Sequence, residues 1–127
     1  MNIFGIGTDI VSVDRIKKSL KNKKFISRIF NEKEIFKCKK NNNSVNCYAK
    51  RFAAKEAFSK ALGTGISNGI NFNEIVVLNK KSGKPYISII GQTRKILKKK
   101  FKRKKSKISL SLSDEKKYAV AFVTISL

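Results

Sequence analysis

The sequence contains no histidine and no tryptophan, and it has only one proline, one methionine and two cysteines among 127 residues. Histidine is the side chain that normally titrates near neutral pH, so any acid–base chemistry must use carboxylates, lysine, water or a bound metal. Cys38 and Cys47 are too few for a disulfide scaffold or, without further ligands, for a zinc site. We therefore expect free thiols in a reducing compartment.

Acidic residues are also scarce, because eight Asp and Glu stand against 30 Lys and Arg, a formal net charge of +22. Such a surplus favours an acidic partner: nucleic acid, an anionic membrane, a phosphate ligand or an acidic protein. Most of the surplus is lysine in a chain that is also rich in asparagine and isoleucine, which a general compositional bias explains as well. The charge alone therefore selects none of these partners.

Long apolar runs are missing, and none approaches the length of a membrane span. The opening MNIFGIGTDIVSVDRI has neither a basic start nor an uninterrupted apolar stretch, unlike a signal peptide. We therefore expect a soluble, cytoplasmic protein with no membrane partner. The length suits one modest core, so we expect residues 1–127 to form a single domain.

The hydrophobic pattern that is present predicts an α+β fold without internal repeats. The strongest helix signal is SVNCYAKRFAAKEAFSKAL, which carries a stripe of alanines suited to close packing. The strand at the C-terminus is apolar on both faces and is typical of a central strand. We expect strands at 3–13, 72–79, 85–90, 108–113 and 118–127, and helices at 14–20, 24–30, 32–40, 44–62 and 91–105.

Two carboxylates stand out because acids are so rare. Asp9 lies within the apolar strand at 3–13, and Glu56 lies within the helix at 44–62. A carboxylate near a core needs a partner, and the simplest partners are Lys60 for Glu56 and some Lys or Arg for Asp9. If the strand end and the helix face converge, the two carboxylates instead form a hard-oxygen site of the kind that Mg²⁺ uses with a diphosphate. Spacing alone favours the ion pairs.

Three further segments carry weaker signals. The loop GTGI at 63–66 could wrap its N–H groups around a phosphate, but a glycine after a helix is more often its cap. SGKP at 82–85 is most simply a turn. The Lys/Arg run at 95–107 is most simply a solvated face, and it also supports an alternative function, a basic non-enzymatic nucleic-acid-binding module.

Four segments taken together resemble the holo-acyl-carrier-protein synthases, a family of 4′-phosphopantetheinyl transferases. They are GIGTDIVSVDRI, RFAAKEAFSKALGTGI, SGKPYISI and SLSDEKKYAVAFV, in that family's order and at about its spacing, and they span nearly the whole chain. The second is the most specific, since a bare KEA is common. The resemblance implies an α+β fold with a small antiparallel sheet and a long packed helix.

The resemblance also implies a set of site residues. The metal carboxylates of the family match Asp9 and Glu56, which with Lys60 would carry catalysis with Mg²⁺. Contacts to coenzyme A are implied for Arg51, Lys60, Gly63, Thr64, Gly65, Ile66, Gly83, Pro85, Ser111 and Asp114. Many members carry histidine where this chain has Asp114, and a carboxylate brings no positive charge to a phosphate.

The implied reaction moves the 4′-phosphopantetheine arm of coenzyme A onto a serine of apo-acyl carrier protein, in fatty acid biosynthesis. The serine would attack the β-phosphate, Mg²⁺ would neutralise the growing charge, and adenosine 3′,5′-bisphosphate would leave. Without histidine, either Glu56 or a metal-activated water would remove the serine proton. The family is similar in forming homotrimers with sites between subunits.

Acyl carrier proteins are acidic, so the basic early helices are the docking surface we expect. Arg15, Lys24 and Arg28 would face the acidic partner, while Phe25 and Ile29 would supply an apolar centre. The simpler alternative makes Phe25 and Ile29 ordinary core residues.

Overall fold

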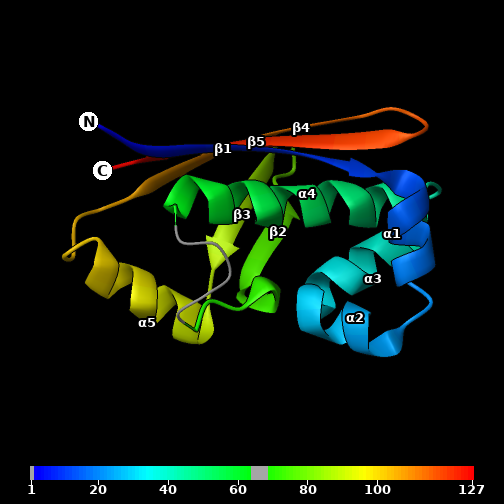
Figure 1. The fold of residues 1–127 in the computed structure, drawn as a ribbon, viewed down its shortest axis with the longest axis horizontal. Helices are drawn as coiled ribbons and strands as arrows, with labels where there is room; N and C mark the ends of the chain where they lie inside the picture. The colour runs from blue at the N-terminus through cyan, green and yellow to red at the C-terminus, as the bar shows by residue number, and fades with distance from the viewer. Residues whose placement is uncertain (1, 64–68) are drawn as a thin grey trace.

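The computed structural model describes residues 2–63 and 69–127. Figure 1 shows three antiparallel strands forming one layer, with one long helix lying directly beneath them. A two-stranded hairpin packs on the other side of that helix, three short helices lie at one end of the molecule, and another helix lies at the other end. The α+β fold with a small antiparallel sheet and a long packed helix is confirmed.

The elements follow one another in a simple order. In the chain they are β1 (Ile3–Ser12), α1 (Val13–Ser19), α2 (Lys23–Ile29), α3 (Glu32–Lys40), α4 (Ser44–Leu62), the 3₁₀ helix η1 (Phe72–Glu74), β2 (Ile75–Asn79), β3 (Pro85–Ile89), α5 (Gly91–Lys100), β4 (Lys107–Asp114) and β5 (Tyr118–Ser126). The sheet order is β1-β5-β4, so β5 is the central strand, as its two apolar faces predict. No helix of the described residues is long and apolar enough to cross a membrane.

Helix α4 lies unusually close to β1 because both elements have small side chains at the contact. The alanine stripe of α4 is buried, and β1 places Gly5 and Gly7 against it. A Cβ atom at Gly5 would overlap the carbonyl of Ala61, and one at Gly7 would overlap the carbonyl of Ala57. The backbone of the strand therefore touches the backbone of the helix, which fixes how residues of the two elements face one another.

Two predicted element boundaries were wrong. Residues 72–74 form a 3₁₀ helix instead of the start of a strand, because Glu74 turns to accept the backbone N–H groups of Gln92 and Thr93 at the start of α5. Helix α5 ends at Lys100 instead of 105, because the ring of Phe101 is buried beside Phe4. The chain then turns away through two residues with positive φ.

The expectation of free cysteines was also wrong. Cys38, in the last turn of α3, forms a disulfide with Cys47 in the first turn of α4, and their Cα atoms lie 5.4 Å apart. The polar break between the two helices is short enough to fold them back on each other, which brings the two sulfurs together.

A buried ion pair joins three elements beneath α4. Lys55 and Glu34 are fully buried, and Lys55 Nζ lies 2.7 Å from Glu34 Oε1. The same ammonium donates to the carbonyls of Phe72 and Ile75, while Glu34 accepts the N–H of Val77. Burial lowers the pKa of Lys55 and the charge of Glu34 opposes that shift. Every polar atom of the pair thus has a partner, and α4 is held to α3 and β2.

Candidate active site

From Gly5 to Val11, strand β1 turns its odd-numbered residues toward α4 and its even-numbered residues away from it. Gly7 and Val11 are buried on the inner side, and Asp9 between them keeps 15% of its side chain exposed. Ile6 and Ile10 on the outer side are 61% and 66% exposed. This alternation places a single carboxylate of the strand against the long helix.

Lys60 of α4 bridges to this carboxylate at the free edge of β1. Its Nζ lies 3.1 Å from Asp9 Oδ1 and donates to the carbonyl of Thr8 at 2.9 Å. Strand β1 is an edge strand, so the lysine satisfies a carbonyl that no neighbouring strand can reach. The side chain of Lys60 is 57% exposed, which leaves its ammonium free to turn toward a ligand.

Glu56 lies one helical turn before Lys60, on the same face of α4. Burial is the largest cause that raises the pKa of Glu56, and the negative charge of Asp9 raises it further, while Lys60 opposes the shift. The strand carboxylate and the helix carboxylate are therefore close enough for their charges to interact. We call Asp9, Glu56 and Lys60 the carboxylate–lysine cluster.

Among the described residues, the predicted ion pair is found for Asp9 and none is found for Glu56. Lys60 was the simplest partner for Glu56, yet it pairs with Asp9. Within residues 2–63 and 69–127, no group of three or more Asp, Glu, Cys or His side chains gathers in a way that would hold a metal ion. Two carboxylates therefore suit an ion that takes its remaining ligands from water and from substrate phosphates.

Arg51 lies on a different face of α4 and reaches the hairpin instead. Its guanidinium is buried, with Nη2 2.8 Å from Asn79 Oδ1 and Nη1 3.3 Å from the carbonyl of Cys47. Asn79 in turn donates to the carbonyl of Gly83, and it is the strand partner of Pro85. The structure therefore brings Arg51 together with Gly83 and Pro85 in what we call the arginine–turn cluster.

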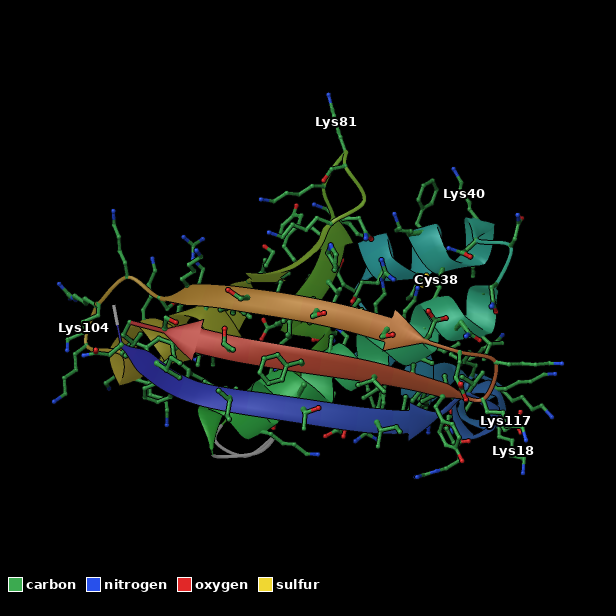
Figure 2. All side chains as sticks on the ribbon, turned by 90° about the horizontal axis from the view of Figure 1, so that it is seen from above. Lys18, Cys38, Lys40, Lys81, Lys104 and Lys117 are labelled. Atoms are coloured by element: carbon green, nitrogen blue, oxygen red, sulfur yellow. A yellow bond between two sulfur atoms is a disulfide. The ribbon has the colours of Figure 1, made fainter. Side chains whose placement is uncertain are left out.

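The other residues implied to contact coenzyme A are placed differently, as far as the structure describes them. Gly63 has φ 79° and caps α4, and Thr64, Gly65 and Ile66 fall outside the described residues. Ser111 pairs with Phe122 on the free face of the sheet, which Figure 2 shows from above without a covering helix. No residue of the carboxylate–lysine cluster shares that face.

Asp114 is engaged at the beginning of α4. Its carboxylate accepts from Asn46 Nδ2 at 2.8 Å and lies 3.6 Å from Lys50 Nζ. Both partners, Asn46 and Lys50, lie on the turns of α4 before Arg51, whereas Lys60 lies near the end of the helix. Within one chain, Asp114 holds the β4–β5 turn to α4.

The expected docking residues fall into an exposed group and a half-buried group. Arg15 of α1 and Lys24 and Arg28 of α2 are exposed, as a docking surface requires. Phe25 and Ile29 are half-buried and pack on the core, with the ring of Phe25 against Phe52. These two side chains therefore serve the core for most of their surface.

Sequence reasoning missed Asn79 and the pair of Glu34 and Lys55. A single asparagine at the end of a strand carries no distinctive pattern. Lys55 was indistinguishable from the many exposed lysines, although Phe52 and Phe58, one turn before and after it on the same face of α4, do indicate a buried position.

The comparisons with known proteins all match the same family. Residues 5–123 match the model of the 4′-phosphopantetheinyl transferase superfamily. A protein of Pelagibacter ubique described as holo-[acyl-carrier-protein] synthase is 53% identical over 125 residues, covering 98% of both chains. One of the same description from Ehrlichia chaffeensis is 48% identical over 128 residues, covering 97% of this chain and 96% of the relative.

Solved structures give the same result. The holo-[acyl-carrier-protein] synthase of Neisseria meningitidis superposes with a TM-score of 0.87 at 39% identity, covering 98% of this chain and 99% of the other. The Bacillus anthracis enzyme, described in complex with coenzyme A (3′,5′-ADP), superposes with a TM-score of 0.79 at 38% identity, covering 98% and 97%.

Proposed function

This chain belongs to the 4′-phosphopantetheinyl transferase superfamily, and from that premise we propose the reaction that its site performs. It transfers the 4′-phosphopantetheine moiety of coenzyme A to a serine of apo-acyl carrier protein, in fatty acid biosynthesis. The products are holo-acyl carrier protein and adenosine 3′,5′-bisphosphate. The observation that carries the proposal is the convergence of Asp9, Glu56 and Lys60 at the edge of β1, in a chain whose relatives are holo-[acyl-carrier-protein] synthases.

Lys60 binds the diphosphate of coenzyme A in this proposal. Its ammonium is more than half exposed and is held by one carboxylate and one carbonyl, so it exchanges these partners for phosphate oxygens at small cost. At the β-phosphate it stabilises the negative charge that develops as the bond to the departing nucleotide breaks.

Glu56 accepts the proton of the attacking serine. The sequence left the choice between Glu56 and an activated water open. In the metal-free protein, burial and the charge of Asp9 raise the pKa of Glu56, which makes this carboxylate a better proton acceptor than an ordinary exposed one. Its place beside Asp9 also puts it next to the diphosphate that Lys60 binds.

A magnesium ion fits the two carboxylates, because they are hard oxygen ligands and a bound cation would offset the burial and the repulsion from Asp9 that raise the pKa of Glu56. Asp9 and Glu56 would hold it. When bound, the ion neutralises charge on the diphosphate oxygens. Asp9 exchanges its pairing with Lys60 for this role, which leaves the lysine to the phosphates.

The arginine–turn cluster supports the nucleotide half of coenzyme A. Arg51 is buried, and its Nε has no hydrogen-bond partner among the described residues. Through Asn79 it fixes the turn that carries Gly83 and Pro85, the turn proposed to lie on the adenine side. Arg51 therefore shapes the nucleotide site by holding the turn, as well as by any phosphate contact.

The assembly we propose is a homotrimer with the active site between subunits. The free face of the sheet carries large exposed apolar side chains: Ile6, Ile10, Tyr118 and Phe122. A contiguous apolar surface of this kind is typical of an interface. Ser111 lies on the same face, so it would act on the coenzyme of a neighbouring copy.

The experiment is incubation of the protein with apo-acyl carrier protein, coenzyme A and Mg²⁺, followed by mass spectrometry of the carrier. We expect the mass of one phosphopantetheine group to be added. Asp9→Ala and Glu56→Ala should each lose most of this activity, whereas Lys39→Gln on the exposed side of α3 should keep it. An unmodified carrier with the wild-type protein would rule out the proposal, and near-wild-type rates in either carboxylate variant would remove that residue from the mechanism.

A further inference from the structure

One cavity in the described part of the chain has no place in the proposed reaction. It has a volume of about 1050 Å³ and lies between α5 and the loop that leads to β4. Its lining, which we call the α5 pocket, is Arg94, Lys95, Lys98, Lys99, Arg103, Lys104, Lys105 and Ser106. No residue of the carboxylate–lysine cluster or of the arginine–turn cluster is among them.

The pocket is also remote from the expected carrier surface. Figure 1 shows α5 and α1 at opposite ends of the molecule, and Figure 2 shows Lys104 at the end opposite to Lys18. A role in docking the carrier protein through Arg15 would need a single partner to span both ends.

Seven of the eight lining residues are cations without carboxylate partners. The chain has no acidic residue between Glu74 and Asp114. Each ion pair found among residues 2–63 and 69–127 uses a lysine outside the pocket. Glu74 contacts α5 at its first turn, where it accepts the N–H groups of Gln92 and Thr93. No ion pair between it and a pocket cation is found among the described residues, so seven cations face at most one nearby carboxylate.

The floor beneath these cations is apolar. A smaller adjoining cavity of about 180 Å³ shares Arg94, Lys98 and Lys104 with the pocket and is also lined by Leu97 and Phe101. These two apolar side chains are about 5% exposed. A cleft with charge of one sign and low-dielectric walls concentrates the electric field and draws in counter-ions.

The backbone of the pocket adds an observation that composition does not explain. Lys102 and Arg103 have φ values of 52° and 63°, a region that glycine normally occupies. They close α5 with the hydrogen bonds of a helix-ending motif, Lys102 N to Lys99 O and Arg103 N to Lys98 O. The chain therefore keeps a cation of the pocket, Arg103, where glycine would relieve strain, and strained residues of this kind gather at functional sites.

We propose that the α5 pocket binds a compact polyphosphate anion, a chain of about three phosphate groups. The lining supplies guanidinium forks from Arg94 and Arg103 and ammonium groups around them, which suits several phosphates at once. Its described lining contains no aromatic side chain on which a base could stack, and the exposed ring of Phe4 lies against Phe101, outside that lining. Recognition is therefore of phosphate groups alone, without readout of a base or sugar.

The test is calorimetric titration of the full-length protein with sodium tripolyphosphate, with adenosine 3′,5′-bisphosphate present to occupy the catalytic site. We expect one equivalent to bind, more weakly as salt is raised. Arg94→Gln and Arg103→Gly should each weaken binding about tenfold. Lys39→Gln, which removes one exposed charge elsewhere, should leave the affinity unchanged.

Arg103→Gly also separates a binding role from a structural one. Because glycine accepts positive φ, this variant should melt at or above the wild-type temperature while binding less. A lower melting temperature with unchanged binding would overturn the proposal, as would equal losses in Lys39→Gln and Arg103→Gly. Tighter binding of a single-stranded oligonucleotide that is insensitive to Arg94→Gln would assign the charge to nucleic acid and also overturn it.

Discussion

Ionisation of Glu56 destabilises the folded protein. Burial and the nearby charge of Asp9 raise its pKa in the folded protein above its value in the unfolded chain. The folded state therefore binds this proton more tightly, so stability falls as pH rises from the ordinary carboxyl range through the folded pKa. Above that window, the ionised Glu56 is available as a base at a constant cost in stability.

Glu56→Gln should consequently raise the melting temperature at neutral pH and flatten its dependence on pH. The same change should lower the transfer rate by about a hundredfold or more, since it removes the proposed base. Thermal unfolding across the acidic to neutral range, together with the transfer assay, measures both effects. Glu32→Gln, an exposed carboxylate of α3, is the control and should change neither. A destabilised Glu56→Gln at neutral pH would contradict this account.

The buried pair of Lys55 and Glu34 gives a second prediction. Lys55→Met should destabilise the protein by about 3–5 kcal/mol, because it leaves the Glu34 carboxylate buried without its cation. The double variant Lys55→Met, Glu34→Gln should recover much of that loss, since no uncompensated charge remains. Urea unfolding of both single variants and the double variant completes the cycle. Additive losses would mean that the two residues do not act as a pair.

Among single residues, the sequence predicted those of a type that is rare in this chain, the acids, and missed those of a type that is common, such as lysine. Asp9 and Glu56 were evident because a chain with so few acids places them in apolar surroundings. Lys55 was hidden among many lysines, and its burial depends on partners 17 to 21 residues away. Such long-range partners leave no periodic trace in a sequence.

Between elements, the decisive feature is the backbone contact of β1 with α4. Gly7→Ala should push the helix from the strand, because its Cβ would overlap the Ala57 carbonyl. We expect a loss of about 3 kcal/mol in stability and a further loss of activity, since Glu56 moves away from Asp9. Urea unfolding and transfer assays on folded protein measure the two losses. Gly83→Ala, where a Cβ meets nothing within 4 Å, should cost less stability despite its positive φ.

The helices α1 and α2 carry the prediction for the carrier protein. Arg15→Glu should raise the KM for acyl carrier protein severalfold and leave the KM for coenzyme A unchanged. The reason is that Arg15 is exposed, and its hydrogen bond is to Ser12 and not to a residue of the arginine–turn cluster. Steady-state kinetics with each substrate varied in turn separates the two. Lys39→Glu on α3 is the matched charge reversal. Unchanged values for both substrates would exclude Arg15 from the docking surface.

The elements were predictable where local signals agree. Helix α4 has the bounds Ser44–Leu62 that the sequence indicates, with Gly63 as its left-handed cap. Asn31 caps α3 with a reciprocal bond to Glu34, again as the residue types suggest. The end of α5 was missed because the buried ring of Phe101 and its contact with Phe4 decide it, and that contact joins opposite ends of the sequence.

For the whole molecule, the free face of the sheet is the feature that a single chain leaves unexplained. Phe122→Asp should convert the proposed trimer into a monomer, because it places a charge at the centre of the apolar face. Light scattering during size-exclusion chromatography measures the change. Phe36→Asp, which changes a more exposed phenylalanine on α3, should leave the mass unaltered. A monomeric wild type would refute the assembly, and neither the family match nor the fold would be affected.

Strand β1 presents Asp9 on one side and Ile6 and Ile10 on the other, from alternate positions of the stretch that follows the register shift between Ile3 and Gly5. One residue inserted or deleted between Ile6 and Asp9 would turn the acid outward and a branched hydrocarbon toward Lys60 as long as the strand stays regular. Such a change would damage catalysis and self-association together, whereas a point change damages one property at a time. The register shift at the start of the strand is where an odd residue is absorbed, so we expect functional versions of this stretch to vary in length there and not between Ile6 and Asp9.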